Sequence, residues 1–306
     1  MPAADRYARL TGAAFCAVAA VAFSGKAVII KLAYRYGVDA LTLLALRMLF
    51  SAPLFGALAA WSARRGGAQA LSRGELASIA ALGLVGYYLS SYFDFLGLQH
   101  ITVALERLVL FLYPTFVLLL SALLLGRRVT VVDVIGIGVS YLGIAFVFVN
   151  DLSTHQGDAV RGSLWVALAA LLYAIYLMGS GRLVGRVGSI RFACYAGVVS
   201  CVGVVAHYVV ATPDWHRIAS QPAPVYGLAI LMAAVSTVMP IVLTSEGIRR
   251  IGASHASILG AVGPVATIFL GYAFLGEPIT AVQVAGAALV LAGVLTVTLH
   301  ARKAEA

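Results

Sequence analysis

Long apolar runs separated by short polar links make up almost the whole chain. Each run is about 20 residues long, enough at about 1.5 Å per residue to cross a hydrocarbon core about 30 Å thick. The runs lack the alternation of barrel strands, and backbone polar groups in lipid must be satisfied internally, so they are predicted to be helices. We expect ten spans, at 10–30, 39–61, 75–98, 102–125, 129–150, 161–181, 190–211, 224–246, 253–275 and 280–299.

An internal repeat relates the two halves of this pattern. When the chain is shifted by 150 positions, residues 97–143 align without a gap with residues 247–293. Glycine and proline are prominent among the matches, and both constrain the backbone rather than merely fill volume. The identical pairs include Gly97 with Gly247, Pro114 with Pro264, Gly126 with Gly276, Gly136 with Gly286 and Gly143 with Gly293. Such a repeat sets the expected architecture.

The repeat also predicts how its two halves are oriented in the membrane. The offset covers five predicted helices, an odd number, so equivalent helices would cross the membrane in opposite directions. Inverted repeats are typical of secondary transporters, which bind substrate near the midplane. The predicted fold is therefore an all-α integral membrane protein of ten transmembrane helices, arranged as two inverted five-helix repeats at 10–149 and 161–299.

Composition and charge agree with a membrane location. The chain is 62% hydrophobic and 11% charged, whereas soluble proteins carry roughly 25% charged residues. The net charge of +9 is explained by basic residues in cytoplasmic loops, so no nucleic-acid partner is expected. With the N-terminus inside, the outer segments hold Lys31, Arg35, Arg161 and Arg217, and the inner ones hold Arg6, Arg9, Arg64, Arg65, Arg73, Arg127, Arg128, Arg182, Arg186, Arg191, Arg249, Arg250, Arg302 and Lys303.

This asymmetry predicts that both termini are cytoplasmic and that the lipid bilayer surrounds the chain, in the bacterial inner membrane. The first apolar run is long enough to span a bilayer, so it is expected to be a helix rather than a cleavable signal peptide. No cofactor or metal is expected, because Cys16, Cys194 and Cys201 lie in apolar runs without C-x-x-C spacing. A homodimer is left open.

These features resemble the EamA family of the drug/metabolite transporter superfamily, whose plan is ten helices in two five-helix repeats. The resemblance rests on Lys31 and Arg47, which look like the family's basic landmarks, and on the helix prolines Pro114 and Pro264. Leu275-Gly276-Glu277 looks like the Gly-Glu that closes the fourth helix of the second repeat. The resemblance implies a transporter of a small metabolite, amino acids included.

The chain departs from the family pattern at three places, and the last of them alters the expected cavity. Phe23 stands where many members have Trp, and Arg127 replaces the glutamate that would match Glu277. Glu106 and Arg107 put two charges where members usually carry small or apolar residues.

Charged residues inside spans are the first candidates for chemistry, because each costs about 2.5–3.5 kcal/mol to insert. They are Lys26, Arg47, Asp94, Glu106 and Arg107, all expected in the outer half of the first repeat. Lys26 either attracts a carboxylate, or forms a gate with Glu106 or Asp94, or extends to the interface. Arg47 is either a structural partner for an acid or for helix-end carbonyls, or a substrate contact.

Glu106 and Arg107 point about 100° apart on a helix, so one is expected to face the cavity and the other a neighbouring helix. Asp94 and Glu106 flank the predicted outer link between the third and fourth helices. They are either proton-titrating groups that couple transport to a gradient, or a static gate or ion pair.

Tyrosines mark the rest of the expected cavity: Tyr87, Tyr113, Tyr173 and Tyr176. Tyr113, beside Pro114 in mid-span, is the strongest of them. Pro114 and Pro264 each remove a backbone hydrogen bond in mid-span, which predicts either a static kink or a moving hinge.

The leading prediction is a secondary active transporter, more an exporter than an importer, and not an enzyme. Its expected partner is a small-molecule substrate such as an amino acid or a related amphipathic compound, with proton coupling as one option. An intramembrane serine hydrolase using Ser254, in the short match Gly252-Ala253-Ser254-His255, is the alternative from another class. A passive channel is the third.

Overall fold

The computed structural model describes residues 3–65, 71–126, 129–154, 158–212, 214–260 and 262–305, and within these ranges every regular element is a helix. The α-helices are α1 (Ala3–Tyr34), α2 (Ala40–Arg65), α3 (Arg73–Gly83), α4 (Ser90–Leu98), α5 (Val103–Leu110), α6 (Tyr113–Leu125), α7 (Val131–Thr154), α8 (Asp158–Val187), α9 (Ser189–Ala211), α10 (Ala223–Ala233), α11 (Met239–Gly260), α12 (Gly263–Leu270) and α13 (Ala281–Glu305). Three π-helical segments, η1 (Leu84–Leu89), η3 (Ala234–Val238) and η4 (Gly271–Leu275), and the 3₁₀ turn η2 (Trp215–Ile218) complete it.

Most of the predicted spans return as long apolar helices. Among the described residues, 8 stretches are long and apolar enough to cross a membrane, and Gly263–Leu275 and Ala281–Val297 are shorter apolar helices. The 8 stretches are Leu10–Tyr34, Ala40–Ser62, Arg73–Leu98, Val103–Leu125, Val131–Leu152, Asp158–Val187, Ser189–Ala211 and Ala223–Ile251. The all-helical membrane architecture is confirmed, and the total of ten spans stays a prediction.

One expected link is helical instead. The sequence predicts a break between spans ending at 246 and starting at 253, but α11 continues to Gly260. The repeat equivalent of this region, between α4 and α5, does break. There Thr102 caps α5, because its side chain accepts a hydrogen bond from the Leu105 N–H. The matching residue is Gly252, and it lies within the continuous helix α11.

Both mid-span prolines stand at breaks between helices. Phe111 and Leu112 form a turn after α5, and Pro114 lies in the first turn of α6. Pro264 likewise lies in the first turn of α12. Proline is well tolerated there, since the first N–H groups of a helix lack intrahelical partners. The backbone is therefore interrupted at both prolines, and the proposed hinge motion stays a prediction.

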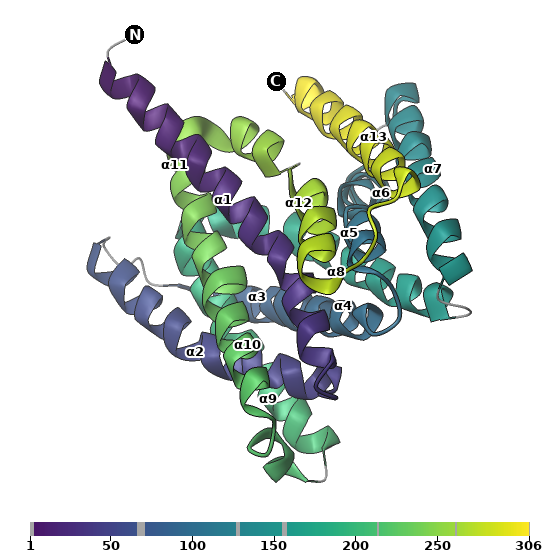
Figure 1. Cartoon of the computed structure of the whole chain (residues 1–306). Helices are drawn as coiled ribbons and strands as arrows, with labels where there is room; N and C mark the ends of the chain where they lie inside the picture. Colours follow the sequence, from purple (N-terminus) through teal and green to yellow (C-terminus); the bar gives the residue numbers. More distant parts are fainter. Residues whose placement is uncertain are drawn as a thin grey trace.

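Glycines bring α7 and α13 into close antiparallel contact, and the two helices lie side by side in Figure 1. A Cβ at Gly136 would lie 2.9 Å from the carbonyl oxygen of Gly293, and one at Gly143 would lie 2.5 Å from that of Gly286. The numbering thus rises along α7 as it falls along α13. Gly136 therefore contacts Gly293, the repeat equivalent of Gly143, and Gly143 contacts Gly286, the repeat equivalent of Gly136.

A second pair of contacts follows the same offset. The carbonyl oxygen of Gly12 lies close to Gly247 where α1 packs on α11, and that of Gly162 lies close to Gly97 where α8 packs on α4. Residues 12 and 162, like 97 and 247, are 150 positions apart. Close helix approach therefore recurs at matching points of the two halves.

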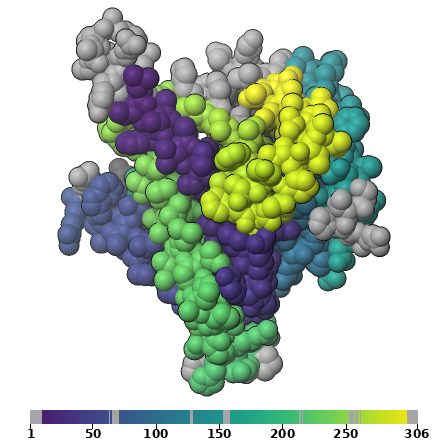
Figure 2. All heavy atoms as spheres, viewed as in Figure 1, coloured from purple at the N-terminus to yellow at the C-terminus, as the bar shows by residue number. Residues whose placement is uncertain are grey.

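The chain ends and the α1–α11 contact lie toward one end of the bundle (Figure 1). There Glu246 pairs with Arg249 at 2.6 Å and Arg250 at 2.8 Å, and Arg250 donates to the Thr11 hydroxyl at 2.7 Å. In Figure 2, α1, α11 and α13 share the visible face. A large apolar core fills the space among α1, α2, α4, α9 and α10.

Candidate functional site

An ion pair between α1 and α4 lies at the centre of the candidate site. The Lys26 ammonium is 2.6 Å from Asp94 Oδ2, and only 13% and 2% of the two side chains are exposed. Of the two acids considered as partners for Lys26, the structure therefore selects Asp94. The Lys26 side chain is mostly buried in this pairing.

Glu106 joins this pair from α5. It is fully buried, and within the described part of the chain neither of its carboxylate oxygens accepts a hydrogen bond. Its carboxyl group lies within hydrogen-bonding reach of that of Asp94 and within electrostatic range of Lys26 and Arg107. A hydrogen bond between two carboxyl groups requires one of them to carry a proton. The arrangement can therefore hold one proton between Asp94 and Glu106.

Arg107 points to different neighbours, as the 100° separation predicts. Its Nη2 donates to the Ser24 hydroxyl at 3.0 Å, and Ser24 donates to the Gly263 carbonyl at 2.9 Å. Its guanidinium also lies 5.8 Å from the centre of the Phe111 ring. Arg107 thus connects α5 to α1 and to the start of α12, while its Nε has no partner among the described residues.

Arg47 approaches the same centre from α2. Its Nη2 donates to the Ser91 hydroxyl at 3.2 Å, its guanidinium lies 5.3 Å from the Phe95 ring centre, and Asp94 is within electrostatic range. It is 3% exposed. The structure therefore places all five predicted charged residues together, with Asp94 central to the group.

The predicted tyrosines form a continuous row beside these charges. Tyr113 and Tyr173 meet edge to face with ring centres 5.2 Å apart, and Tyr173 stacks on Tyr176 at 5.7 Å. Tyr176 meets Tyr87 at 5.3 Å and donates to its hydroxyl at 3.4 Å. Arg107 lies within electrostatic range of Tyr113 and Tyr173, so the row begins where the charged group ends.

Local backbone features let this row form. Tyr87 lies in the π-helical segment η1, and π-helical bulges are frequent at functional sites. At Gly86 a Cβ would lie 2.5 Å from Tyr176 Cβ. Only glycine lets the Tyr176 ring approach η1 this closely.

Sequence reasoning missed a contact network around Glu277. Its carboxylate accepts from the Val103 backbone N–H at 3.2 Å and lies 3.7 Å from the Lys31 ammonium. Arg35 donates to the Leu275 carbonyl at 2.8 Å nearby. The signal in the sequence was the acidic residue directly after Gly276, because the equivalent residue in the first repeat is the basic Arg127. The side chains of Ser254 and His255, the alternative hydrolase residues, lie outside the described part of the chain.

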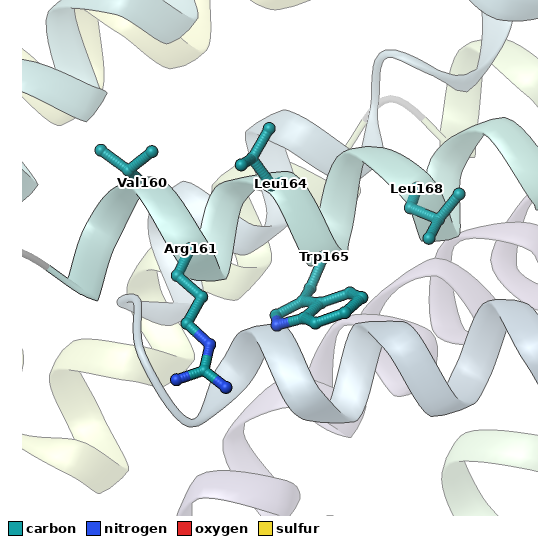
Figure 3. A pocket seen from close by; sticks show the side chains of 5 residues that line it. All are labelled: Val160, Arg161, Leu164, Trp165 and Leu168. Atoms are coloured by element: carbon teal, nitrogen blue, oxygen red, sulfur yellow. The ribbon is translucent and has the colours of Figure 1, made fainter.

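The two mapped surface pockets lie away from the charged group. One, of about 500 Å³, is lined by a single face of α8 and contains none of the predicted site residues (Figure 3). Its lining residues are Val160, Arg161, Leu164, Trp165 and Leu168. The other, of about 420 Å³, lies between α1 and α10. Neither pocket is lined by any of the five buried charged residues, so the charged group defines the better candidate site.

Comparisons with known proteins agree with this architecture. The model of the EamA-like transporter family matches residues 10–149 and 160–299. An uncharacterized transporter of Bacillus subtilis, YcbK, is 32% identical over 282 residues, covering 90% of this chain and 88% of its own. A probable terminal-alkyne amino-acid exporter of Streptantibioticus cattleyicolor is 28% identical, covering 73% of each chain. A solved crystal structure has the same fold, with a TM-score of 0.63 at 19% identity over 98% of this chain and 99% of its own.

Proposed function

The chain belongs to the EamA-like transporter family, and we propose that it is a secondary active exporter of a small amphipathic metabolite such as an amino acid. As a family member with 8 apolar helices of spanning length among its described residues, it is a multi-pass protein of the cell membrane and a transporter rather than an enzyme. The name of the Streptantibioticus relative supports an amino-acid-like cargo.

Alternating access between two inverted five-helix repeats, 10–149 and 161–299, is the proposed mechanism. The contacts of α7 with α13 support it, because equivalent glycines meet in antiparallel order. The position of both chain ends toward one end of the bundle (Figure 1) supports the proposal that both termini lie on one side of the membrane, and the basic inner segments predict that this side is the cytoplasm. Pro114 and Pro264 are proposed to be the hinges, since the helical hydrogen bonding is interrupted beside each.

One observation carries the proposal: a buried group of charges, Lys26, Asp94, Glu106 and Arg107, converges from α1, α4 and α5 beside a row of tyrosines. Buried charges inside spans are costly and mark substrate or ion pathways. We place the substrate between these charges and the tyrosines, and proton coupling at Asp94 and Glu106. The positive charge of Arg47 on α2 stabilises the carboxylate of Asp94 electrostatically.

Transport by purified protein in proteoliposomes tests this function. A mixture of amino acids and small amphipathic metabolites is loaded, with and without a pH gradient, and the compounds that cross are identified by mass spectrometry. We expect saturable flux, driven by the gradient and accelerated by cargo on the opposite side. Flux that never saturates would favour a channel. Labelling of Ser254 by a serine-reactive fluorophosphonate would favour the hydrolase.

Variants test the coupling. Asp94→Asn and Glu106→Gln are expected to abolish gradient-driven flux. Glu246→Gln is the matched control, because Glu246 pairs with Arg249 and Arg250 on α11, away from the charged group. Coupling at these carboxylates is refuted if both variants keep gradient-driven flux equal to that of the control.

A further inference from the structure

Two neighbouring carboxyl groups, those of Asp94 and Glu106, carry three buried oxygens without a donor. Asp94 Oδ1, Glu106 Oε1 and Glu106 Oε2 all lack a hydrogen-bond partner among the residues that the structure describes. Leaving a buried polar atom unpaired costs about 1–3 kcal/mol, and more when the group is charged. Three such atoms in one place therefore indicate a position that something outside the chain fills.

Two kinds of occupant supply donors there. A single proton lets one carboxyl donate to the other, which satisfies two of the three oxygens. A primary ammonium group carries three N–H donors, one for each unpaired oxygen. The fourth oxygen, Asp94 Oδ2, already binds the primary ammonium of Lys26 at 2.6 Å. The pair of acids thus has the chemistry to bind this group.

We propose that Asp94 and Glu106 form the binding site for a protonated primary amine on the cargo, and that this amine and a proton occupy the site in turn. The inference rests on the proposed transport function and names the cargo's charged group. When the amine binds, the O–H bond of the carboxyl breaks and its proton leaves to the medium. When a proton returns, the N–H···O contacts are lost and the amine departs with its own protons.

The surrounding charges restrict the amine. Lys26 of α1 neutralises Asp94, Arg107 follows Glu106 on α5, and Arg47 of α2 lies behind Asp94. Tyr34 of α1 lies within electrostatic range of Asp94, and Tyr113 of α6 and Tyr173 of α8 lie within electrostatic range of Arg107. A second positive charge on the cargo would meet Arg107 and be repelled. The site therefore favours a monoamine whose apolar or aromatic body lies along the tyrosine row.

Proton release on binding tests the inference directly. Purified protein in detergent micelles, weakly buffered with a pH indicator, is titrated with 2-phenylethylamine, N-acetyl-2-phenylethylamine and phenylacetate. We expect only the free amine to bind and to release protons, up to one per chain. In the pH range where the site is protonated, the affinity for the amine should fall about tenfold for each unit by which the pH is lowered. The reason is that one proton competes with the amine for the carboxyl groups.

Substitutions of Glu106 test whether the binding and the proton release occur at this carboxyl group. Glu106→Gln should lose both binding and proton release, while Glu106→Asp and the control Glu246→Gln should retain release; a thermal melt confirms that each is folded. The inference is overturned if 2-phenylethylamine fails to bind, if it binds without proton release, or if phenylacetate binds instead. Saturable metabolite flux in proteoliposomes in any of these cases would leave the transport function intact.

Discussion

Replacing Gly143 by alanine tests whether the two halves are held together by close backbone contact. The new Cβ would lie 2.5 Å from the Gly286 carbonyl oxygen and 2.9 Å from Leu289 Cβ. Optimal contact distances are roughly 3.5 Å, so α7 and α13 would have to separate by about 1 Å. The obstructing oxygen belongs to the backbone, so no side-chain rotation relieves it, and overpacking of this kind costs about 1–3 kcal/mol.

Gly138→Ala is the matched control on the same helix. Nothing lies within 4 Å of a Cβ there, and both variants gain the same helix propensity, roughly 0.8–1 kcal/mol. The difference between them therefore isolates the steric cost, and Gly143→Ala should be less stable by about 1–3 kcal/mol. Unfolding by SDS in mixed micelles, followed by circular dichroism, measures it. Equal unfolding midpoints for the two variants would refute the close contact.

Three further predictions concern stability. Lys26→Met or Asp94→Asn alone should cost about 3–5 kcal/mol because each leaves a buried charge unpaired, and the double variant should cost less than the two singles together in the same SDS assay. Thr102→Val should cost about 1 kcal/mol by removing the cap of α5, whereas Thr102→Ser should unfold like the unaltered chain. Gly126→Ala and Gly276→Ala should each cost about 1–2 kcal/mol, since both glycines have positive φ (68° and 72°); their effects should add in the double variant, and a clear departure from the sum would show that the two sites are coupled.

Hydropathy predicted the helices well because lipid imposes one length and one polarity on every span. Where the prediction was wrong, a helix end was misplaced. The break expected after Glu246 is absent and α11 continues to Gly260, whereas Thr102 caps a new helix at the equivalent place in the first repeat. The length of an apolar run predicts the length of a membrane-spanning helix, whereas capping residues determine where the helix begins and ends. A single capping side chain is a weak signal within a run of about 20 residues.

The charged group was predicted as a set, but its pairing was not. Insertion cost marks any charge within a span, so the positions of the charges in the sequence were enough to find all five residues, Lys26, Arg47, Asp94, Glu106 and Arg107. Choosing Asp94 rather than Glu106 as the partner of Lys26 depends on how each helix is rotated about its axis. Ser24, which connects Arg107 to α12, had no signal at all, because a serine in a span costs little.

The unequal halves of this chain have a consequence for stoichiometry. The positions equivalent to Lys26, Asp94, Glu106 and Arg107 hold Tyr176, Thr244, Ala256 and Ser257. Two identical five-helix units facing each other would carry two acid pairs, and each unit would have to accept every substitution made in the other. Joining unlike halves in one chain leaves one acid pair. On the exchange proposed above, this single pair would take up one amine or one proton at a time.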